Sequence, residues 1–322
     1  MRQYKQQPPY SVQIELTEGC TLACSFCGIN GIREKPGGFK FMSKDTIEHL
    51  AKLLSNAAAA DGWNPRLEFA MHGEPTMHRN LCEFILTIRH AMPRSYMLLL
   101  TNGSGLSSGN VTDKVDTVMD SGLNTLGIER YSWSKFWKPI LSEYKGFYPV
   151  RRYPEERDAN PHKRHKGQFI VFIQDIAEAS KGTHSKLTTH CGTGLPPVQD
   201  PLLQRCARPF RELSIRWDGS VALCCNDWRG HYRCGNINRV NSLEAIWNGK
   251  AFDAARRELY RGNRHMLPNV CAKCDERTYR NGLLPDGNGL FEMTKPSAAS
   301  REVLKNSMSK PPLTEPVKRE WE

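Results

Sequence analysis

Cys20, Cys24 and Cys27 stand close together near the amino end of the chain, with C-x3-C-x2-C spacing. Three thiolates from one loop can bind three irons of a 4Fe–4S cluster, which leaves the fourth iron free to take an exogenous ligand. An open metal position is typical of sites that do chemistry rather than of structural sites. A zinc knuckle is the simpler alternative, but zinc would need a fourth Cys or His close by.

A second group of cysteines lies in the carboxyl-terminal part of the chain. It surrounds a predicted β-hairpin, with strands at 212–216 and 220–223 on either side of an Asp-Gly turn. A predicted helix at 242–261 separates the hairpin from a final Cys-x2-Cys pair. Four thiolates brought together in this way predict a closed site that holds either a second Fe–S cluster or zinc. The cysteines of this part are Cys206, Cys224, Cys225, Cys234, Cys271 and Cys274.

The elements that must position these loops alternate between β-rich runs and amphipathic helical stretches from residue 10 to about 176. Strands are predicted at 11–16, 66–71, 96–101, 125–129 and 168–174. Helices are predicted at 44–59 (with Ser43 as N-cap), 80–91 and 111–121. Crossovers this regular predict an α/β fold, a full or partial TIM-like barrel, with the site in the loops at the carboxyl ends of the strands.

Composition narrows the class of protein further. The length of 322 residues fits one large domain and a smaller one, and the net charge of +11 favours polyanionic partners or anionic substrates. Eleven cysteines, many in tight groups, are too sparse for a disulfide scaffold, so we expect a reducing, cytoplasmic location. No apolar run is long enough to cross a bilayer and the amino end is polar, so neither a membrane protein nor a secreted one is expected.

The first cysteine loop, with Phe26 between its last two cysteines, resembles the cluster motif of radical S-adenosylmethionine (SAM) enzymes. Gly73-Glu74-Pro75-Thr76 is similar to the family's Gly-Gly-Glu motif, whose backbone meets the amino group of SAM. Thr101-Asn102-Gly103 stands where relatives contact the SAM ribose or carboxylate. Without the resemblance, both motifs are ordinary turns.

Two further positions complete the set that the resemblance implies. Arg130 ends a predicted strand and either clamps the SAM carboxylate or forms an ordinary rim salt bridge. Ile173 lies on the strand where the adenine packs in relatives. The residues expected to contact SAM are Phe26, Gly73, Glu74, Pro75, Thr101, Asn102, Arg130 and Ile173.

Residues 206–276 resemble the auxiliary-cluster domains called SPASM and twitch. In order, they contain Cys-x2-Pro-Phe, Asp-Gly-x-Val-x-x-Cys-Cys, Gly-Asn-Ile, Ser-Leu-x-x-Ile-Trp-Asn and Cys-x2-Cys. The cysteines suffice for one auxiliary cluster, as in twitch. The resemblance implies Cys206, Cys224, Cys271 and Cys274 as its ligands, and either Cys225 or Cys234 could replace Cys224.

The resemblance also implies a domain organisation and a chemistry. The expected units are a core at 1–180 that forms a partial (β/α)6 TIM-like barrel, a linker at 181–205, a SPASM/twitch domain at 206–284 and a flexible tail at 285–322. SAM and two 4Fe–4S clusters are the expected cofactors, with an electron donor such as flavodoxin or ferredoxin. In the family, SAM cleavage gives a 5′-deoxyadenosyl radical that abstracts a substrate hydrogen. Cys191 is either a hydrogen or proton donor near the site or an ordinary free thiol.

The resemblance allows several classes of substrate. Relatives modify peptides, oxidise sugar alcohols or aminocyclitols, or mature other enzymes, and a phage branch rearranges amino-acid-decorated thymine in DNA. The basic segment 151–166 and the aromatic residues near it are typical of a nucleic-acid-binding track, although a solvated basic loop gives the same pattern. These aromatic residues are Tyr131, Trp133, Phe136, Trp137, Tyr144, Phe147, Tyr148 and Tyr153.

We therefore expect an isomerase of phage DNA hypermodification that acts in the host cytoplasm. It would convert a glycine linked through nitrogen to the 5-methyl carbon of thymine into the carbon-linked form, and the target base would be extruded from the duplex. The alternatives are a radical SAM dehydrogenase of a small alcohol or aminocyclitol, a peptide-modifying enzyme, and a non-catalytic Fe–S or zinc protein that binds nucleic acid.

Overall fold

The computed structural model describes residues 6–32, 38–174, 188–195 and 199–276, and a short strand pair further on. That pair is β12 (Gly282–Leu283) and β13 (Leu290–Phe291). Part of the expected linker and most of the expected tail lie outside the described residues, so the proposed domain boundaries stay predictions.

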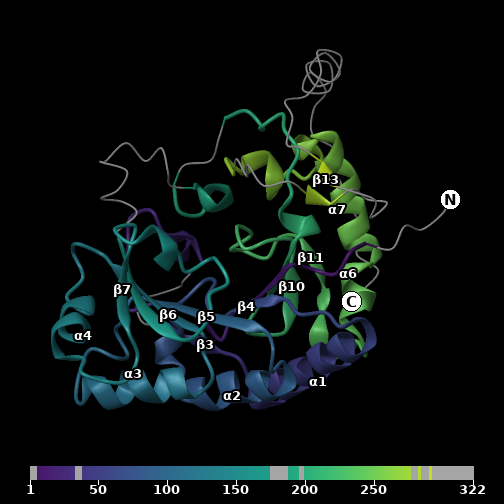
Figure 1. The fold of residues 1–322 in the computed structure, drawn as a ribbon. Helices are drawn as coiled ribbons and strands as arrows, with labels where there is room; N and C mark the ends of the chain where they lie inside the picture. Colours follow the sequence, from purple (N-terminus) through teal and green to yellow (C-terminus); the bar gives the residue numbers. More distant parts are fainter. Residues whose placement is uncertain are drawn as a thin grey trace.

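A mixed sheet forms the centre of the molecule (Figure 1). Its strands, in spatial order, are β11 (Arg233–Asn236), β10 (Ser220–Ala222), β9 (Glu212–Ile215), β1 (Ser11–Ile14), β4 (Arg66–Glu68), β5 (Tyr96–Thr101), β6 (Thr125–Arg130), β8 (Phe169–Gln174) and β7 (Val150–Tyr153). From β9 to β7 all neighbours pair in parallel, whereas β10 pairs antiparallel with β9 and β11. The predicted α/β fold with a parallel sheet is confirmed, and β9 to β11 extend that same sheet.

Helices cover the outer face of the sheet. Figure 1 shows α1 (Lys44–Asp61), α2 (Leu81–Ala91) and α3 (Val111–Asp120) in a row, with α4 (Trp137–Glu143) beyond them. Ser43 caps α1 as predicted, because its hydroxyl accepts a hydrogen bond from the Thr46 amide. The buried side of α1, with Ile47 and Leu50 among its members, joins one continuous core with the sheet. A second small pair of strands, β2 (Thr17–Glu18) and β3 (Lys40–Phe41), leads into α1.

The helix predicted at 242–261 is two helices, α6 (Leu243–Trp247) and α7 (Lys250–Arg261). Ser242 caps α6, and Gly249 begins α7 in an extended conformation. A Cβ at Gly249 would lie 2.8 Å from the Ala245 carbonyl oxygen, so the tight break requires glycine.

Most residues of the basic segment 151–166 are exposed, as its composition predicts, but part of the segment packs against the sheet. It contains edge strand β7 and a 3-10 helix whose Ala159 is completely buried against Phe169 and Val171. Arg66, the first residue of β4, donates a hydrogen bond of 2.6 Å to the His162 carbonyl. The part of the segment around His162 therefore lies at the amino-terminal ends of the strands. The part that follows β7 lies at their carboxyl ends, because β7 runs parallel to β8 and Glu155 pairs with Arg130. Its charges are partly paired within the segment, since Arg151 contacts Glu156 at 2.9 Å and Asp158 at 2.7 Å.

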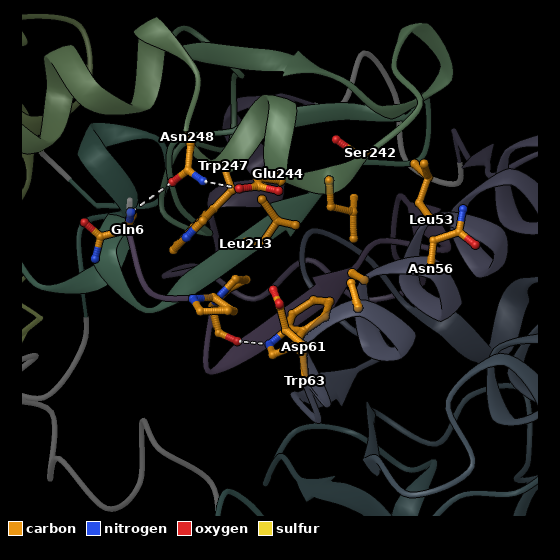
Figure 2. A pocket seen from close by; sticks show the side chains of 15 residues that line it. Gln6, Leu53, Asn56, Asp61, Trp63, Leu213, Ser242, Glu244, Trp247 and Asn248 are labelled. Atoms are coloured by element: carbon orange, nitrogen blue, oxygen red, sulfur yellow. Dashed lines mark hydrogen bonds between the residues drawn. The ribbon is translucent and has the colours of Figure 1, made fainter. Parts of the chain in front are cut away.

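Residues 6–9 of the amino-terminal segment lie along an apolar groove of about 160 Å³ between α1 and α6 and form hydrogen bonds on both sides of it (Figure 2). The indole Nε1 of Trp63 donates to the Pro9 carbonyl at 2.7 Å, and that of Trp247 donates to the Gln7 carbonyl at 2.7 Å. The backbone of Gln6 donates to the Asn248 side chain at 3.2 Å. These bonds join the two halves of the chain on the side of the sheet that carries α1.

None of the described helices has both the length and the apolar character needed to cross a membrane.

Candidate functional site

A cavity of about 370 Å³ opens at the carboxyl ends of β1, β4, β5 and β6. From the amino-terminal half it is lined by most of the residues that the sequence singled out: Cys20, Cys24, Phe26, Cys27, Gly73, Glu74, Thr101 and Asn102. From the other half it is lined by Thr188, His190, Cys225, Asn226 and Trp228. The site is therefore closed by segments that are far apart in the sequence.

The turn after β4 is held against the first cysteine loop by a close backbone approach at Gly73. A Cβ at this position would lie 2.2 Å from the Thr17 carbonyl oxygen and 2.6 Å from that of Gly19. The next amide, that of Glu74, donates to the Gly19 carbonyl at 2.8 Å. Only glycine fits here, so the backbone of this turn is fixed next to the cysteine loop.

The Glu74 carboxyl group organises the ends of two strands. It accepts hydrogen bonds from the Thr76 amide (3.0 Å), the Thr101 hydroxyl (2.5 Å) and the Asn102 amide (2.7 Å). Burial raises its pKa against these bonds, which lower it. Asn102 in turn donates from its side chain to the Cys20 sulfur at 3.3 Å. The Gly-Glu-Pro-Thr and Thr-Asn-Gly motifs thus form one hydrogen-bonded unit beside the first cysteine.

The three thiols of the first loop share one side of the cavity. Burial and, to a smaller extent, the neighbouring thiols raise the pKa of Cys20 to about 11 and that of Cys24 to about 12. Sulfurs in this environment become thiolates only when positive charge is close, as a bound metal provides. The soft, sulfur-only donor set suits an Fe–S cluster.

Three aromatic rings stand beside this loop, and two of them, Phe26 and Tyr131, line the cavity. The centroid of Phe26 lies 6.3 Å from Tyr131 and 6.1 Å from Trp133, and the last two rings stack at 5.2 Å with an interplanar angle of 23°. Trp133 is 50% exposed. An aromatic face is therefore available to solvent next to the cysteine loop.

Three of the predicted SAM contacts do not line the cavity. Arg130 pairs with Glu155 at 2.7 Å, which is the rim salt bridge considered as its alternative. Ile173 pairs in register with Glu129, whose side chain does line the cavity. Pro75 is buried at the start of a short 3-10 helix.

The second thiol group contains the four predicted ligands and one more. Burial raises the pKa of Cys206, Cys224 and Cys271, and the other thiols of the group raise it further. Cys191 joins them, since its thiol donates a hydrogen bond that lowers the pKa of Cys274. Cys191 therefore lies with this group, and among the cavity-lining residues the cysteine from the carboxyl-terminal half is Cys225.

The two other candidates from this half have different surroundings, although Cys225 is close enough to Cys224 to raise the pKa of that thiol. The Cys225 sulfur accepts a hydrogen bond of 3.2 Å from Arg208, and burial raises its pKa to about 12. Cys234 lies near Arg256 and Asp227. Among the described residues, no three Cys, His, Asp or Glu side chains are close enough around one point to hold a single metal ion.

Residues 188–195 join the two thiol groups, a role that their composition did not indicate. A Cβ at Gly194 would lie 2.3 Å from the Phe26 carbonyl oxygen, and Cys191, three residues earlier, contacts Cys274. His190 and Cys191 both adopt left-handed backbone angles, with φ of 48° and 55°. Burial lowers the pKa of His190 to about 4, so its imidazole is neutral at neutral pH.

His72 and Trp228 line the cavity as well, but neither was predicted from the sequence as a site residue. The His72 Nδ1 lies 2.7 Å from a carboxylate oxygen of Glu15, and its Nε2 lies 2.9 Å from the Cys225 carbonyl. The rings of His72 and Trp228 are 4.5 Å apart. Trp228 also packs on Gly28, where a Cβ would lie 2.5 Å from the indole. These contacts connect the first cysteine loop and the turn after β4 to the Cys225 backbone.

Comparisons with known proteins give the same two regions. A family model described as the radical SAM superfamily matches residues 14–142, and one described as an iron–sulfur cluster-binding domain, SPASM, matches residues 206–275. The chain is 20% identical over 267 residues to the S-adenosyl-L-methionine-dependent 2-deoxy-scyllo-inosamine dehydrogenase of Niallia circulans. The matched region covers 82% of this chain and 92% of that protein. It is 27% identical over 121 residues to the GTP 3′,8-cyclase of Edwardsiella ictaluri, over 37% of this chain and 33% of that protein.

Solved structures give the same fold. The crystal structure of BtrN in complex with AdoMet and 2-DOIA has a TM-score of 0.61 and 18% identity, over 84% of this chain and 94% of that one. An open conformation of BtrN has a TM-score of 0.57 and 17% identity over the same shares.

Proposed function

Because the chain belongs to the radical SAM superfamily and carries a SPASM domain, we propose that its cavity is where SAM is cleaved and a substrate hydrogen atom is removed. The protein is a radical SAM enzyme, with SAM and Fe–S clusters as its cofactors. When bound, the cluster and SAM supply a 5′-deoxyadenosyl radical that takes a hydrogen atom from the substrate. One observation carries the proposal: the three-thiol loop and the SAM-motif turn line the same cavity.

The residues around the cavity divide the remaining work. Cys20, Cys24 and Cys27 would hold the SAM-binding cluster, and Asn102 fixes the position of the first of these sulfurs. The backbone at Gly73 lies at the cavity wall, where it can meet the amino group of SAM. Trp228 closes the wall from the SPASM side and keeps water from the reacting atoms.

We assign the second thiol group to the auxiliary cluster. Cys206, Cys224, Cys271 and Cys274 would hold it, as the family pattern implies. Reducing equivalents would come from a donor of the flavodoxin or ferredoxin class.

Reductive cleavage of SAM tests the site directly. Anaerobically reconstituted protein, reduced with dithionite, should convert SAM to 5′-deoxyadenosine and methionine, and Cys24→Ala should abolish this. Cys82→Ala is the matched control, since Cys82 lies on α2 outside the cavity. Wild-type protein that holds iron but releases no 5′-deoxyadenosine would contradict the proposal.

For the substrate, we propose the modified thymine, with isomerisation of its N-linked glycinyl group to the C-linked form. Removal of a hydrogen from the glycinyl carbon creates a radical to which the thymine methylene group can migrate from nitrogen. The net charge of +11 supports a polyanionic partner, and the exposed Trp133 stacked on Tyr131 offers a platform for an extruded base beside the cavity. The part of segment 151–166 around His162 does not support this proposal, because it packs at the opposite ends of the strands.

Nucleoside analysis tests this substrate. DNA from cells that express the protein with its neighbouring genes should contain the C-linked nucleoside by mass spectrometry. Trp133→Ala should lower its yield several-fold, whereas Phe147→Ala should not, although Phe147 is 92% exposed. DNA without any altered nucleoside would exclude this substrate.

A dehydrogenase of a small alcohol or aminocyclitol is the second candidate. It is favoured by the dehydrogenase relative, which covers most of both chains. Substrate-dependent formation of an oxidised product from an aminocyclitol, with no effect on DNA, would select it. Because the chain belongs to a family of enzymes, the alternative of a non-catalytic Fe–S or zinc protein has no support.

A further inference from the structure

Cys225 occupies a different place from the cysteine before it. Cys224 belongs to the second thiol group, whereas Cys225 lines the cavity together with the three cysteines of the first loop. The bend that follows β10 sends the two neighbouring sulfurs to different environments. Cys225 is thus a cavity thiol that neither predicted cluster uses.

The sulfur and the backbone of Cys225 are both held in place. Arg208 donates to the sulfur at 3.2 Å, and its guanidinium is itself fixed by Glu212 at 2.9 Å and Glu276 at 3.0 Å. His72 contacts the Cys225 carbonyl at 2.9 Å and directly precedes Gly73 in the SAM-motif turn. The position of the thiol is therefore set relative to that turn.

We propose that Cys225 is a catalytic residue that donates a hydrogen atom to the substrate radical. This inference rests on the proposed function, because a substrate radical must first form in the cavity. An S–H bond is weaker than the C–H or N–H bond that its hydrogen would form, so transfer from the thiol is favourable. Since Arg208 uses the sulfur only as an acceptor, the thiol hydrogen remains available to the cavity.

In this step the Cys225 S–H bond breaks and a new C–H or N–H bond forms on the product, which leaves a thiyl radical. One electron from a donor of the flavodoxin or ferredoxin class and one proton from solvent restore the thiol. One further electron is used to cleave SAM, so each turnover uses two electrons and one proton in total. SAM is therefore consumed as a co-substrate, and the hydrogen placed on the product comes from solvent.

Deuterium tests the donor without knowledge of the natural substrate. Reconstituted, dithionite-reduced enzyme in D2O is given SAM alone, so that the nearest exchangeable hydrogen is transferred during uncoupled cleavage. We expect one deuterium in the 5′-deoxyadenosine from wild type, and its loss in Cys225→Ala and Cys225→Ser. Tyr131→Phe removes a phenolic O–H that lines the cavity, and Cys234→Ala removes a thiol outside it. Both variants should keep the label, because Cys225 is intact in each. A label that persists in Cys225→Ala, or disappears in Tyr131→Phe, would overturn the proposal.

Two measurements keep the test independent of turnover. Cys225→Ala should retain the iron content of wild type, whereas Cys224→Ala should lose about one cluster's worth of iron. In the holoenzyme, SAM should slow iodoacetamide labelling of Cys225 but not of Cys82. Loss of iron in Cys225→Ala, or labelling that SAM does not affect, would overturn the proposal.

An oligonucleotide that carries the N-linked glycinyl thymine then separates the two proposals. Product that contains one solvent deuterium supports both. Absence of product, with the label still passing from Cys225 to 5′-deoxyadenosine, refutes the substrate and keeps the donor. Product without solvent deuterium refutes the donor and keeps the substrate.

Discussion

Replacing Thr101 by valine should destabilise the enzyme by about 3 kcal/mol, although the two side chains have almost the same shape. The Thr101 hydroxyl donates to Glu74 at 2.5 Å and accepts from the Gly103 amide at 2.9 Å, both in a buried environment. Valine loses the first bond, at a cost of about 1 kcal/mol, and leaves a buried N–H without its acceptor, at a cost of about 2 kcal/mol.

Thr17 provides a matched control. It is as buried as Thr101, each being 3% exposed, but its hydroxyl has no hydrogen-bond partner among the described residues. Thr17→Val should therefore leave stability unchanged or raise it by up to ~1 kcal/mol, because an unsatisfied buried hydroxyl is removed.

Urea unfolding of the reconstituted protein, followed by tryptophan fluorescence, measures the difference. With a urea dependence of about 3 kcal/mol per M, the midpoint of Thr101→Val should fall by about 1 M at an unchanged slope. Iron content is matched between the samples, because a lost cluster would itself shift the midpoint. Equal midpoints for the two variants would refute the assignment of the Glu74 network as the support of this site.

Three further predictions follow from the thiol groups, from His190 and from the basic segment. Alanine at Cys27, Cys206 or Cys271 should each remove about four irons per chain in an iron assay, while alanine at Cys191 or Cys234 should leave the count unchanged; iron loss in Cys234→Ala would contradict this assignment. Because burial lowers the pKa of His190 to about 4 from an unfolded value of about 6.5, the unfolded state takes up the proton first as the pH falls. Stability should therefore drop by about 2 kcal/mol from pH 7 to pH 5 through this group, and the drop should be smaller by that amount in His190→Gln in urea titrations. Glutamine at both Lys163 and Lys166 should change conversion of the DNA substrate by less than about twofold in the nucleoside assay, because the part of the segment around His162 packs away from the cavity; a large loss would argue against that placement.

The regular part of the fold could be predicted from the sequence because each element repeats its apolar pattern several times. The strand at Tyr96–Thr101 and the helix that begins after Ser43 follow directly from this pattern. The composition of segment 151–166 indicated its exposed charges, but it indicated neither the four-residue edge strand nor the buried alanine, Ala159. Charge composition describes the average of a segment, whereas packing at Ala159 depends on a single small side chain.

The candidate site was likewise predicted from the sequence only in part. The cysteine spacing and the two turn motifs are local, so the sequence could indicate them and the structure brings them to one cavity. Arg130 had two possible partners, and the choice of Glu155 depends on the position of the strand pair β7 and β8. The sequence left the roles of Cys191 and Cys225 open, because a bend and distant contacts determine that Cys225 lines the cavity while Cys191 lies with the second thiol group.

The SPASM region is better understood as one wall of the active site than as an attached module. Its hairpin extends the sheet through β9 and β1, so the two halves share a single hydrogen-bonded frame. Trp228 fills the space beside Gly28, and His72 reaches across to the backbone of Cys225. A radical reaction needs its substrate fixed and water excluded, and here both conditions depend on residues more than 150 positions apart in the chain. Changes to the hairpin should therefore alter the fate of the substrate radical, even where every ligand of the first cluster is intact.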